Sequence, residues 1–209
     1  MADGQRPVVE ATPRTEVRGV AARLLTVDDV VALSAAGAFG EGEKVELIDG
    51  RLYLSPSEGV RHLDHSGRVG DALFKLLSTT GLDRDWRLIP NLSLRISPVR
   101  LLQPDWAVVK RGVLEVERRF PGPADVALAV EIADSSLLFD EGDKKELYAE
   151  ARLSDYWVVR IGPGDVRICR EPEGGLYKFD RVARPGEGVA PLFALGREIA
   201  ITDLTGPAG

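Results

Sequence analysis

The sequence predicts an α/β (α+β) protein with a mixed central β-sheet flanked by helices. Segments with strand-like apolar patterns alternate along the chain with segments of helical periodicity. One of them, "ADVALAVEIAD", is almost continuously apolar, which is typical of a central strand covered on both faces. The 209 residues suffice for one domain with its own core. We expect a helix and a hairpin near the N-terminus and a second hairpin near the C-terminus.

The N-terminal half contains a short helix, a hairpin and a longer helix. Thr26 is a candidate N-cap with Asp29 three residues later, and an apolar face at residues 30–33 follows before "GAFGEGEK" ends the helix in glycines. In "VELIDGRLYLSP", apolar residues alternate around the turn-forming pair Asp49-Gly50, which predicts a hairpin. Apolar spacing then predicts a helix over residues 60–77.

The C-terminal half reads mainly as strands. "WRLIP" and "LSLRI" predict two short strands, and residues 105–109 predict a third, buried one. After the central strand, "EGDKKELYAEARL" has helical spacing, with Leu147 and Ala151 on one face. "DYWVVRI" predicts another buried strand, and "DVRICREPEGGLYKFDRV" predicts a hairpin that turns at residues 173–175.

These elements suggest a flexible N-terminal arm over residues 1–23, a single domain over 24–203 and a loose tail over 204–209. No apolar run approaches the ~18 residues needed to cross a bilayer, and the N-terminus lacks the apolar core of a signal peptide. We therefore expect a cytoplasmic protein with no membrane partner. The single cysteine, Cys169, excludes an internal disulfide and a cysteine-based zinc site.

The net charge of −6 disfavours non-specific coating by nucleic acid. A local basic groove stays compatible with that total, because arginine and lysine side chains recur between residues 84 and 111. Most of these side chains are better explained as solvated surface residues.

Two carboxylates stand beside apolar strand residues. Asp105 follows Pro104 at the start of a buried strand, and Glu131 lies inside "LAVEIAD". An ionised carboxylate buried among such residues is costly unless it is paired or bound to a metal. If the two strands are neighbours, the carboxylates converge, and two oxygen ligands completed by water describe a Mg²⁺ site. The alternative for Glu131 is a salt bridge to a neighbouring arginine or lysine.

Lys144 and Glu46 are further candidates. Lys144 begins the helix after the loop "DSSLLFDEGD", where it could hold a water or stabilise a phosphoryl transition state beside a metal. The alternative is an exposed lysine at a helix start, although cations are disfavoured there. Glu46 faces opposite to Val45 and Leu47 on its strand, so it points either to solvent or into a metal site.

His62 and His65 are the only histidines, and their i, i+3 spacing puts them on one side of the predicted helix. Either one could contact a substrate phosphate; alternatively, both are polar residues at a helix start. The "HExxH" pattern of metalloproteases is absent. So are GxSxG, the phosphate-binding GxxxxGK[ST] and a GxGxxG at a strand-to-helix turn, which argues against the chemistries that these motifs support.

Pro104-Asp105, a strand glutamate and a lysine form the signature of the PD-(D/E)xK nuclease superfamily, but its usual lysine position, two residues after the glutamate, is Ala133 here. The wider order is "VELIDGRLYLSPSE", a histidine, "QPDWAVV", "LAVEIADSS", a D-x-x-x-K-x-x-x-Y pattern and "DYWVV". This order closely resembles the Uma-two family of restriction-endonuclease-like proteins, from about residue 26 to 168. In that family the lysine has moved to the helix after the glutamate strand.

The resemblance implies a restriction-endonuclease-like core and assigns roles to specific residues. Asp105 and Glu131 match the ligands of Mg²⁺ or Mn²⁺, Lys144 the catalytic lysine and Glu46 an additional acidic residue. His65 fits the family histidine better than His62 does, because Val69 and Gly70 then fall at the expected spacing. These histidines and Tyr148 are the expected substrate-binding residues.

We therefore expect a Mg²⁺-dependent endonuclease that hydrolyses phosphodiester bonds of DNA, with nucleic acid as its partner and a homodimer permitted. One alternative is a catalytically silent module on the same fold, which binds nucleic acid or another protein. A second alternative is a structural protein in which an internal arginine neutralises Glu131 and Lys144 lies far away.

Overall fold

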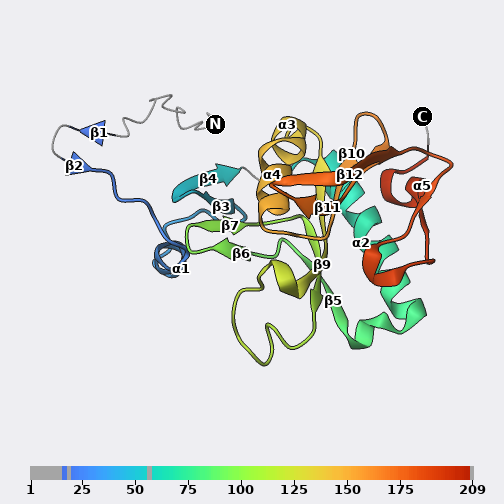
Figure 1. The fold of residues 1–209 in the computed structure, drawn as a ribbon, viewed down its shortest axis with the longest axis horizontal. Helices are drawn as coiled ribbons and strands as arrows, with labels where there is room; N and C mark the ends of the chain where they lie inside the picture. Colours follow the sequence, from blue (N-terminus) through green and yellow to red (C-terminus); the bar gives the residue numbers. More distant parts are fainter. Residues whose placement is uncertain (1–15, 18–19, 56–57, 208–209) are drawn as a thin grey trace, which may run out of the picture.

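A computed structural model describes residues 16–17, 20–55 and 58–207. Its centre is a six-stranded sheet with the order β12-β11-β10-β9-β8-β5 (Figure 1). The strands span Trp86–Pro90 (β5), Trp106–Lys110 (β8), Val126–Ala133 (β9), Asp155–Arg160 (β10), Asp165–Glu173 (β11) and Leu176–Ala183 (β12). Only β9 and β10 run parallel within this sheet; its other neighbouring pairs are antiparallel. The predicted mixed central sheet is confirmed.

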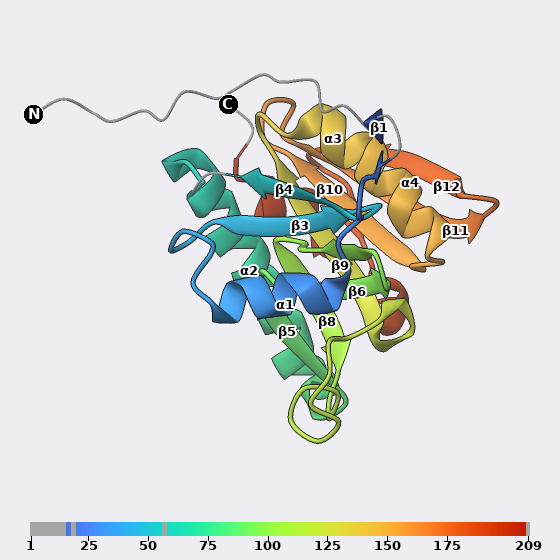
Figure 2. The ribbon, with the colours of Figure 1, turned by 90° about the vertical axis from the view of Figure 1, so that its left-hand side faces the viewer.

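A second, four-stranded sheet has the order β4-β3-β7-β6 and lies beside α1 (Figure 2). Its strands span Lys44–Ile48 (β3), Arg51–Ser55 (β4), Leu94–Ser97 (β6) and Arg100–Leu102 (β7). β3 and β4 form the predicted hairpin, in which Asp49 and Gly50 have φ of 49° and 75°. A Cβ on Gly50 would lie 2.5 Å from Leu24 Cβ, so the turn requires glycine for space as well as for its backbone.

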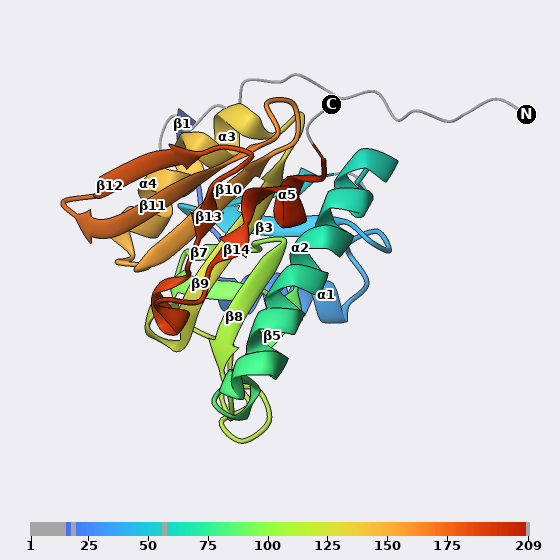
Figure 3. The ribbon, with the colours of Figure 1, turned by 90° about the vertical axis from the view of Figure 1, so that its right-hand side faces the viewer.

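Helices cover both faces of the large sheet. α2 (Val60–Thr80) and α5 (Ile201–Thr205) pack on one face (Figure 3), while α3 (Leu137–Glu141) and α4 (Asp143–Glu150) connect β9 to β10 across the other (Figure 2). Strand β9 contributes to both cores, since Val130 packs with the α2 residues and Ala129 packs with the α4 residues. By strand alternation, Glu131 belongs to the α4 face.

The chain crosses from the small sheet to the large one at the end of β7. Leu102 is the last residue of β7, and Trp106 begins β8 three residues after Gln103. Trp106 pairs with Val130 in the antiparallel β8–β9 ladder, so continuing that register by one residue sets Asp105 opposite Glu131. The expected proximity of the two carboxylate-bearing strands is confirmed, and the carboxylates lie where the two sheets meet.

α1 (Val27–Ala35) begins at Thr26 with the predicted capping box to Asp29. Its buried residues are Val27 and Val30, whereas Val31 is exposed, because only one side of this short helix packs on the small sheet. Short elements complete the described chain: Glu16–Val17 (β1), Val20–Ala21 (β2), Gly188–Val189 (β13) and Ile199–Ala200 (β14), with 3₁₀ turns at Leu82–Arg84, Pro123–Asp125 and Leu192–Ala194.

Three expectations differ from the structure. The segment expected as a loop before Lys144 contains α3, and β7 was not predicted; both are too short to show a period. The expected tail begins too early, because Leu204 and Thr205 lie in α5 and are buried. The arm over residues 1–23 lies mostly outside the described residues and stays a prediction. None of the helices described here is long and apolar enough to span a bilayer.

α2 meets β8 at a glycine. Trp106 lies against α2 and donates its indole Nε1–H to the Ser66 carbonyl at 3.0 Å. A Cβ on Gly70 would lie 2.6 Å from the Trp106 ring, whereas Gly67, in the same helix, has nothing within 4 Å. Trp106 directly follows Asp105, so this contact also positions the proposed site.

We predict opposite effects for two substitutions in α2. Gly70→Ala should lower the free energy of unfolding by roughly 1–3 kcal/mol, because the added methyl group overpacks the contact with Trp106. Gly67→Ala should raise it by up to about 1 kcal/mol, because alanine favours the helix and meets open space. Urea unfolding measures both; equal effects would contradict the assigned contact.

Candidate active site

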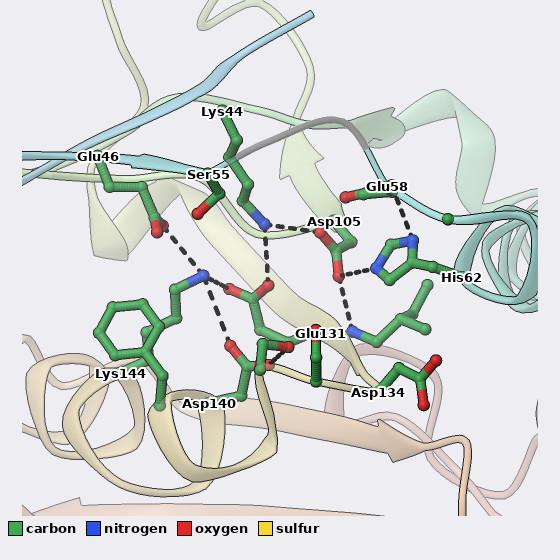
Figure 4. Close-up of a pocket in the computed structure, with 15 residues that line it drawn as sticks. Lys44, Glu46, Ser55, Glu58, His62, Asp105, Glu131, Asp134, Asp140 and Lys144 are labelled. Carbon is green, nitrogen blue, oxygen red and sulfur yellow. Dashed lines mark hydrogen bonds and ion pairs between the residues drawn. The ribbon is translucent and has the colours of Figure 1, made fainter. Parts of the chain in front are cut away.

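The carboxylates line a cavity of about 350 Å³ between the two sheets, the start of α2 and the α3–α4 pair (Figure 4). The charged side chains that line it are Lys44, Glu46, Glu58, His62, Asp105, Glu131, Asp134, Asp140 and Lys144. Ser55, Ser135 and Ser136 add hydroxyl groups. Residues far apart in the sequence therefore converge on one polar cavity.

Asp105 is 4% exposed, and each of its oxygens has separate partners. Oδ2 accepts hydrogen bonds from the Ile132 backbone N–H at 2.7 Å and from His62 Nε2 at 3.2 Å. Oδ1 accepts one from Lys44 Nζ at 2.7 Å. Burial opposes ionisation of this carboxyl, but the bonds from His62 and Lys44 hold its pKa well below the usual range. Asp105 is therefore an anion at neutral pH.

Glu131 is fully enclosed, at 1% exposure. Its Oε1 accepts from Lys144 Nζ at 2.9 Å and from the Tyr148 hydroxyl at 3.3 Å. Its Oε2 accepts only from Lys44 Nζ, at 3.3 Å, among the described residues. Burial raises the pKa of Glu131, and the two lysines oppose that rise. The lysines thus offset part of the cost of this burial, and the pKa of Glu131 stays above its ordinary value.

Lys144 is 2% exposed although it stands at the start of α4. Its Nζ lies 3.0 Å from Glu46 Oε1, 2.9 Å from Glu131 Oε1 and 3.6 Å from Asp140 Oδ1. These carboxylates offset both burial and the unfavourable helix dipole. Burial alone would lower the pKa of Lys144, but Glu131 and Glu46 raise it. The alternative of an exposed lysine at a helix start is wrong.

Glu46 points into the cavity and not to solvent. It is 2% exposed, and its Oε1 accepts from the Gln103 backbone N–H at 2.9 Å, beside the chain crossing between the sheets. Glu46 thus joins the hairpin to the segment that carries Asp105, and it also contacts Lys144.

The two histidines occupy different places. His62 contacts Asp105 and Glu58, whereas His65 does not line the cavity and its Nδ1 donates to the Arg61 carbonyl at 2.8 Å. The structure therefore brings His62 to the cavity, and not His65, which the sequence favoured. The buried face of α2 carries the signal: His62 lies eleven residues before Leu73, about three helical turns, so it continues that face toward β8.

The structure changes the description of Tyr148 and adds Lys44 and Asp140 to the site. Tyr148 has no exposed surface, and its hydroxyl contacts Glu131, so it supports that carboxylate and does not face the cavity opening. Lys44 was not predicted, although one signal was available: it stands two residues before Glu46, and alternating strand residues share a face. Asp140, buried and bonded to Ser136, was noted only as part of a motif.

A cation could bind at two places in this cavity. Asp105 Oδ1 and Glu131 Oε2 face one another across Lys44 Nζ (Figure 4). Glu58, His62 and Asp105 also offer ligand atoms within 4.8 Å of one another. In the second group both imidazole nitrogens already face carboxylates, with Nδ1 2.7 Å from Glu58 Oε2. Burial disfavours the imidazolium, but Asp105 and Glu58 outweigh it and raise the pKa of His62 to about 9.

Residues 27–202 match the Uma2 family, described as "Putative restriction endonuclease". The chain belongs to the Uma2 family. This match covers both sheets and every residue that lines the cavity. No curated protein matches the chain. The family therefore agrees with the resemblance that the ordered motifs indicate.

The solved structures that match this Uma2 chain include the following two. One is a "putative nuclease belonging to DUF820" from Anabaena variabilis, with a TM-score of 0.65 and 17% identity over 86% of this chain and 97% of that one. It supports the restriction-endonuclease-like fold. The other is the type IIG restriction endonuclease BpuSI, with a TM-score of 0.39 and 12% identity over 67% of this chain and 15% of that one.

The raised pKa of His62 predicts a pH-dependent stability. The ordinary pKa is 6.5 and the folded value is about 9, so protonation favours the folded state. The stabilisation from His62 is fully present below pH 6.5 and is lost as the pH rises through 9. Wild type should therefore lose its advantage over His62→Gln across this range, as measured by denaturant unfolding at several pH values. His65→Gln keeps the His62–Asp105 pair and should show the same dependence of the free energy of unfolding on pH as wild type. If the difference in this free energy between wild type and His62→Gln did not change with pH, the raised pKa of His62 would be contradicted.

Proposed function

We propose that this Uma2 chain is a Mg²⁺-dependent endonuclease that hydrolyses phosphodiester bonds of DNA, with Mn²⁺ able to replace Mg²⁺. The observation that carries the proposal is the opposed pair Asp105 Oδ1 and Glu131 Oε2. Each carboxylate is oriented by fixed donors to its other oxygen, from Ile132 N–H on one side and Lys144 on the other. The remaining oxygens meet at one cation, the ammonium of Lys44.

This donor set fits Mg²⁺ or Mn²⁺. Both ions favour carboxylate oxygens, and Mg²⁺ commonly takes one or two protein carboxylates while keeping room for water and phosphate. Asp105 and Glu131 would hold the ion, and Lys44 shows that a single cation can reach both. When bound, the ion supplies Lewis acidity toward the phosphate and lowers the pKa of a bound water.

The charge of the cavity supports a metal requirement. Six carboxyl side chains line it against two lysines and one histidine, counting the described residues. A phosphodiester is an anion and is repelled by such a cavity unless added cations reverse the balance. A divalent ion on Asp105 and Glu131 would supply that change.

The chain's own groups have distinct tasks in this proposal. Lys144 is held by three carboxylates beside the metal ligand Glu131, so its ammonium can orient the attacking water or neutralise charge on the phosphoryl group. Glu46 positions Lys144 and is itself fixed by the Gln103 N–H. His62 donates to Asp105 Oδ2 and so leaves Oδ1 directed at the ion.

A second candidate function is a nucleic-acid-binding module on the same fold that does not cleave. The observation that favours it is Lys44, whose ammonium lies 2.7 Å from Asp105 Oδ1 and 3.3 Å from Glu131 Oε2, at the proposed metal position. The geometry expected for the other alternative, an internal arginine at Glu131 with Lys144 far away, differs from the structure, because Lys144 Nζ lies 2.9 Å from Glu131 Oε1.

We predict that supercoiled plasmid DNA is nicked in the presence of Mg²⁺ or Mn²⁺ and is left intact in EDTA. Asp105→Asn, Glu131→Gln and Lys144→Met should each reduce the nicking rate by about 10²-fold or more, because each removes a metal ligand or the charge beside the reacting phosphate. A circular substrate restricts the assay to endonuclease activity.

Lys145→Met is the matched control, because Lys145 is the next residue in α4 but pairs with Asp180 of β12 and does not line the cavity. It should nick at the wild-type rate. Wild-type protein that nicks neither DNA nor RNA with either ion, while still binding DNA, would favour the non-cleaving module.

A further inference from the structure

Lys44 occupies the point at which the proposed metal would bind. Its Nζ lies 2.7 Å from Asp105 Oδ1 and 3.3 Å from Glu131 Oε2, and no other donor among the described residues contacts these two oxygens. We infer that Lys44 and the divalent cation exchange at this position, and that the displaced ammonium becomes a contact for the substrate phosphate. This inference rests on the proposed function.

The two lysines of the cavity differ in exposure and in the carboxylates that surround them. Lys144 is 2% exposed and is enclosed by carboxylates from β3, β9 and α3. Lys44 is 16% exposed and is the first residue of β3, paired with Ser55, the last residue of β4. Its side chain can therefore withdraw into the cavity from the open end of a hairpin without moving a buried element. Lys144 is thus enclosed by three carboxylates, whereas Lys44 contacts two from the end of a strand.

Charge gives the exchange its direction. The single charge of an ammonium neutralises only part of the Asp105–Glu131 pair, whereas a divalent ion balances both carboxylates. Once such an ion is bound, it repels the ammonium of Lys44 from the same oxygens. The tethered ammonium then adds a positive charge at the ion-loaded cavity, where a phosphate is the complementary ligand. Substrate contact by Lys44 is thereby linked to metal loading.

The first test is calorimetric titration of Mn²⁺ into wild type and Lys44→Met. Methionine keeps much of the length of the side chain and removes the competing charge, so the variant should bind Mn²⁺ about tenfold more tightly or better, which corresponds to about 1.4 kcal/mol. Lys75→Met, at an exposed lysine of α2, should bind as wild type does. Equal affinities in wild type and Lys44→Met would overturn the exchange while leaving the metal site in place. Binding by neither would overturn the proposed function and the exchange with it.

The second test uses wild-type protein and so does not depend on the folding of a variant. Amine acetylation is followed residue by residue by mass spectrometry, with and without Mg²⁺. Lys44 should react several-fold faster with Mg²⁺, because its ammonium leaves the carboxylate pair, while the rate at Lys75 should stay constant. An unchanged acetylation rate at Lys44, under conditions where calorimetry shows bound metal, would overturn the displacement. Any effect of Lys44 on metal affinity would then come only from repulsion between its ammonium and the ion.

Discussion

The buried carboxylate of Glu131 is the constraint on which the arrangement of this site depends. A charge in the middle of the central strand is tolerated only where opposite charges and hydrogen-bond donors surround it. Helix α4 supplies Lys144 and Tyr148, and hairpin strand β3 supplies Lys44. Two elements far apart in the sequence are thus tied to one side chain.

The second carboxylate of the site is positioned by the junction of the two sheets. The chain leaves the small sheet at Leu102 and joins the large one at Trp106, and the crossing segment presents Asp105 opposite Glu131. Proline at position 104 suits this crossing, since a residue without an N–H is best tolerated outside a ladder. The same crossing offers the Gln103 N–H to Glu46. This short crossing segment therefore positions two carboxylates, those of Asp105 and Glu46.

Patterns of sufficient length made much of this fold predictable. The capping box at Thr26, the Asp49-Gly50 hairpin, the long helix α2 and the strand that carries Glu131 follow from local periodicity and turn chemistry. Strand β7 and helix α3 have three and five residues, too few for a period to emerge. The small sheet forms when β3 pairs with β7, which is distant in the sequence, and local sequence patterns do not indicate such pairing.

The site shows the same division between local and long-range information. Asp105 and Glu131 converge as predicted, because an apolar context makes a charge conspicuous, and Lys144 joins them as the family resemblance implies. Lys44 and Glu58 stand in ordinary polar surroundings in the sequence, so only the fold brings them to Asp105. The choice between His62 and His65 needed the direction of the buried face of α2, which points His62 at the cavity.

Anomalous diffraction from a crystal of the wild-type protein soaked in Mn²⁺ would test the proposed metal position directly. We expect a peak in contact with both Asp105 Oδ1 and Glu131 Oε2, with the ammonium of Lys44 withdrawn from them. A soaked crystal with no peak at these oxygens, and with Lys44 still bridging the two carboxylates, would contradict this position.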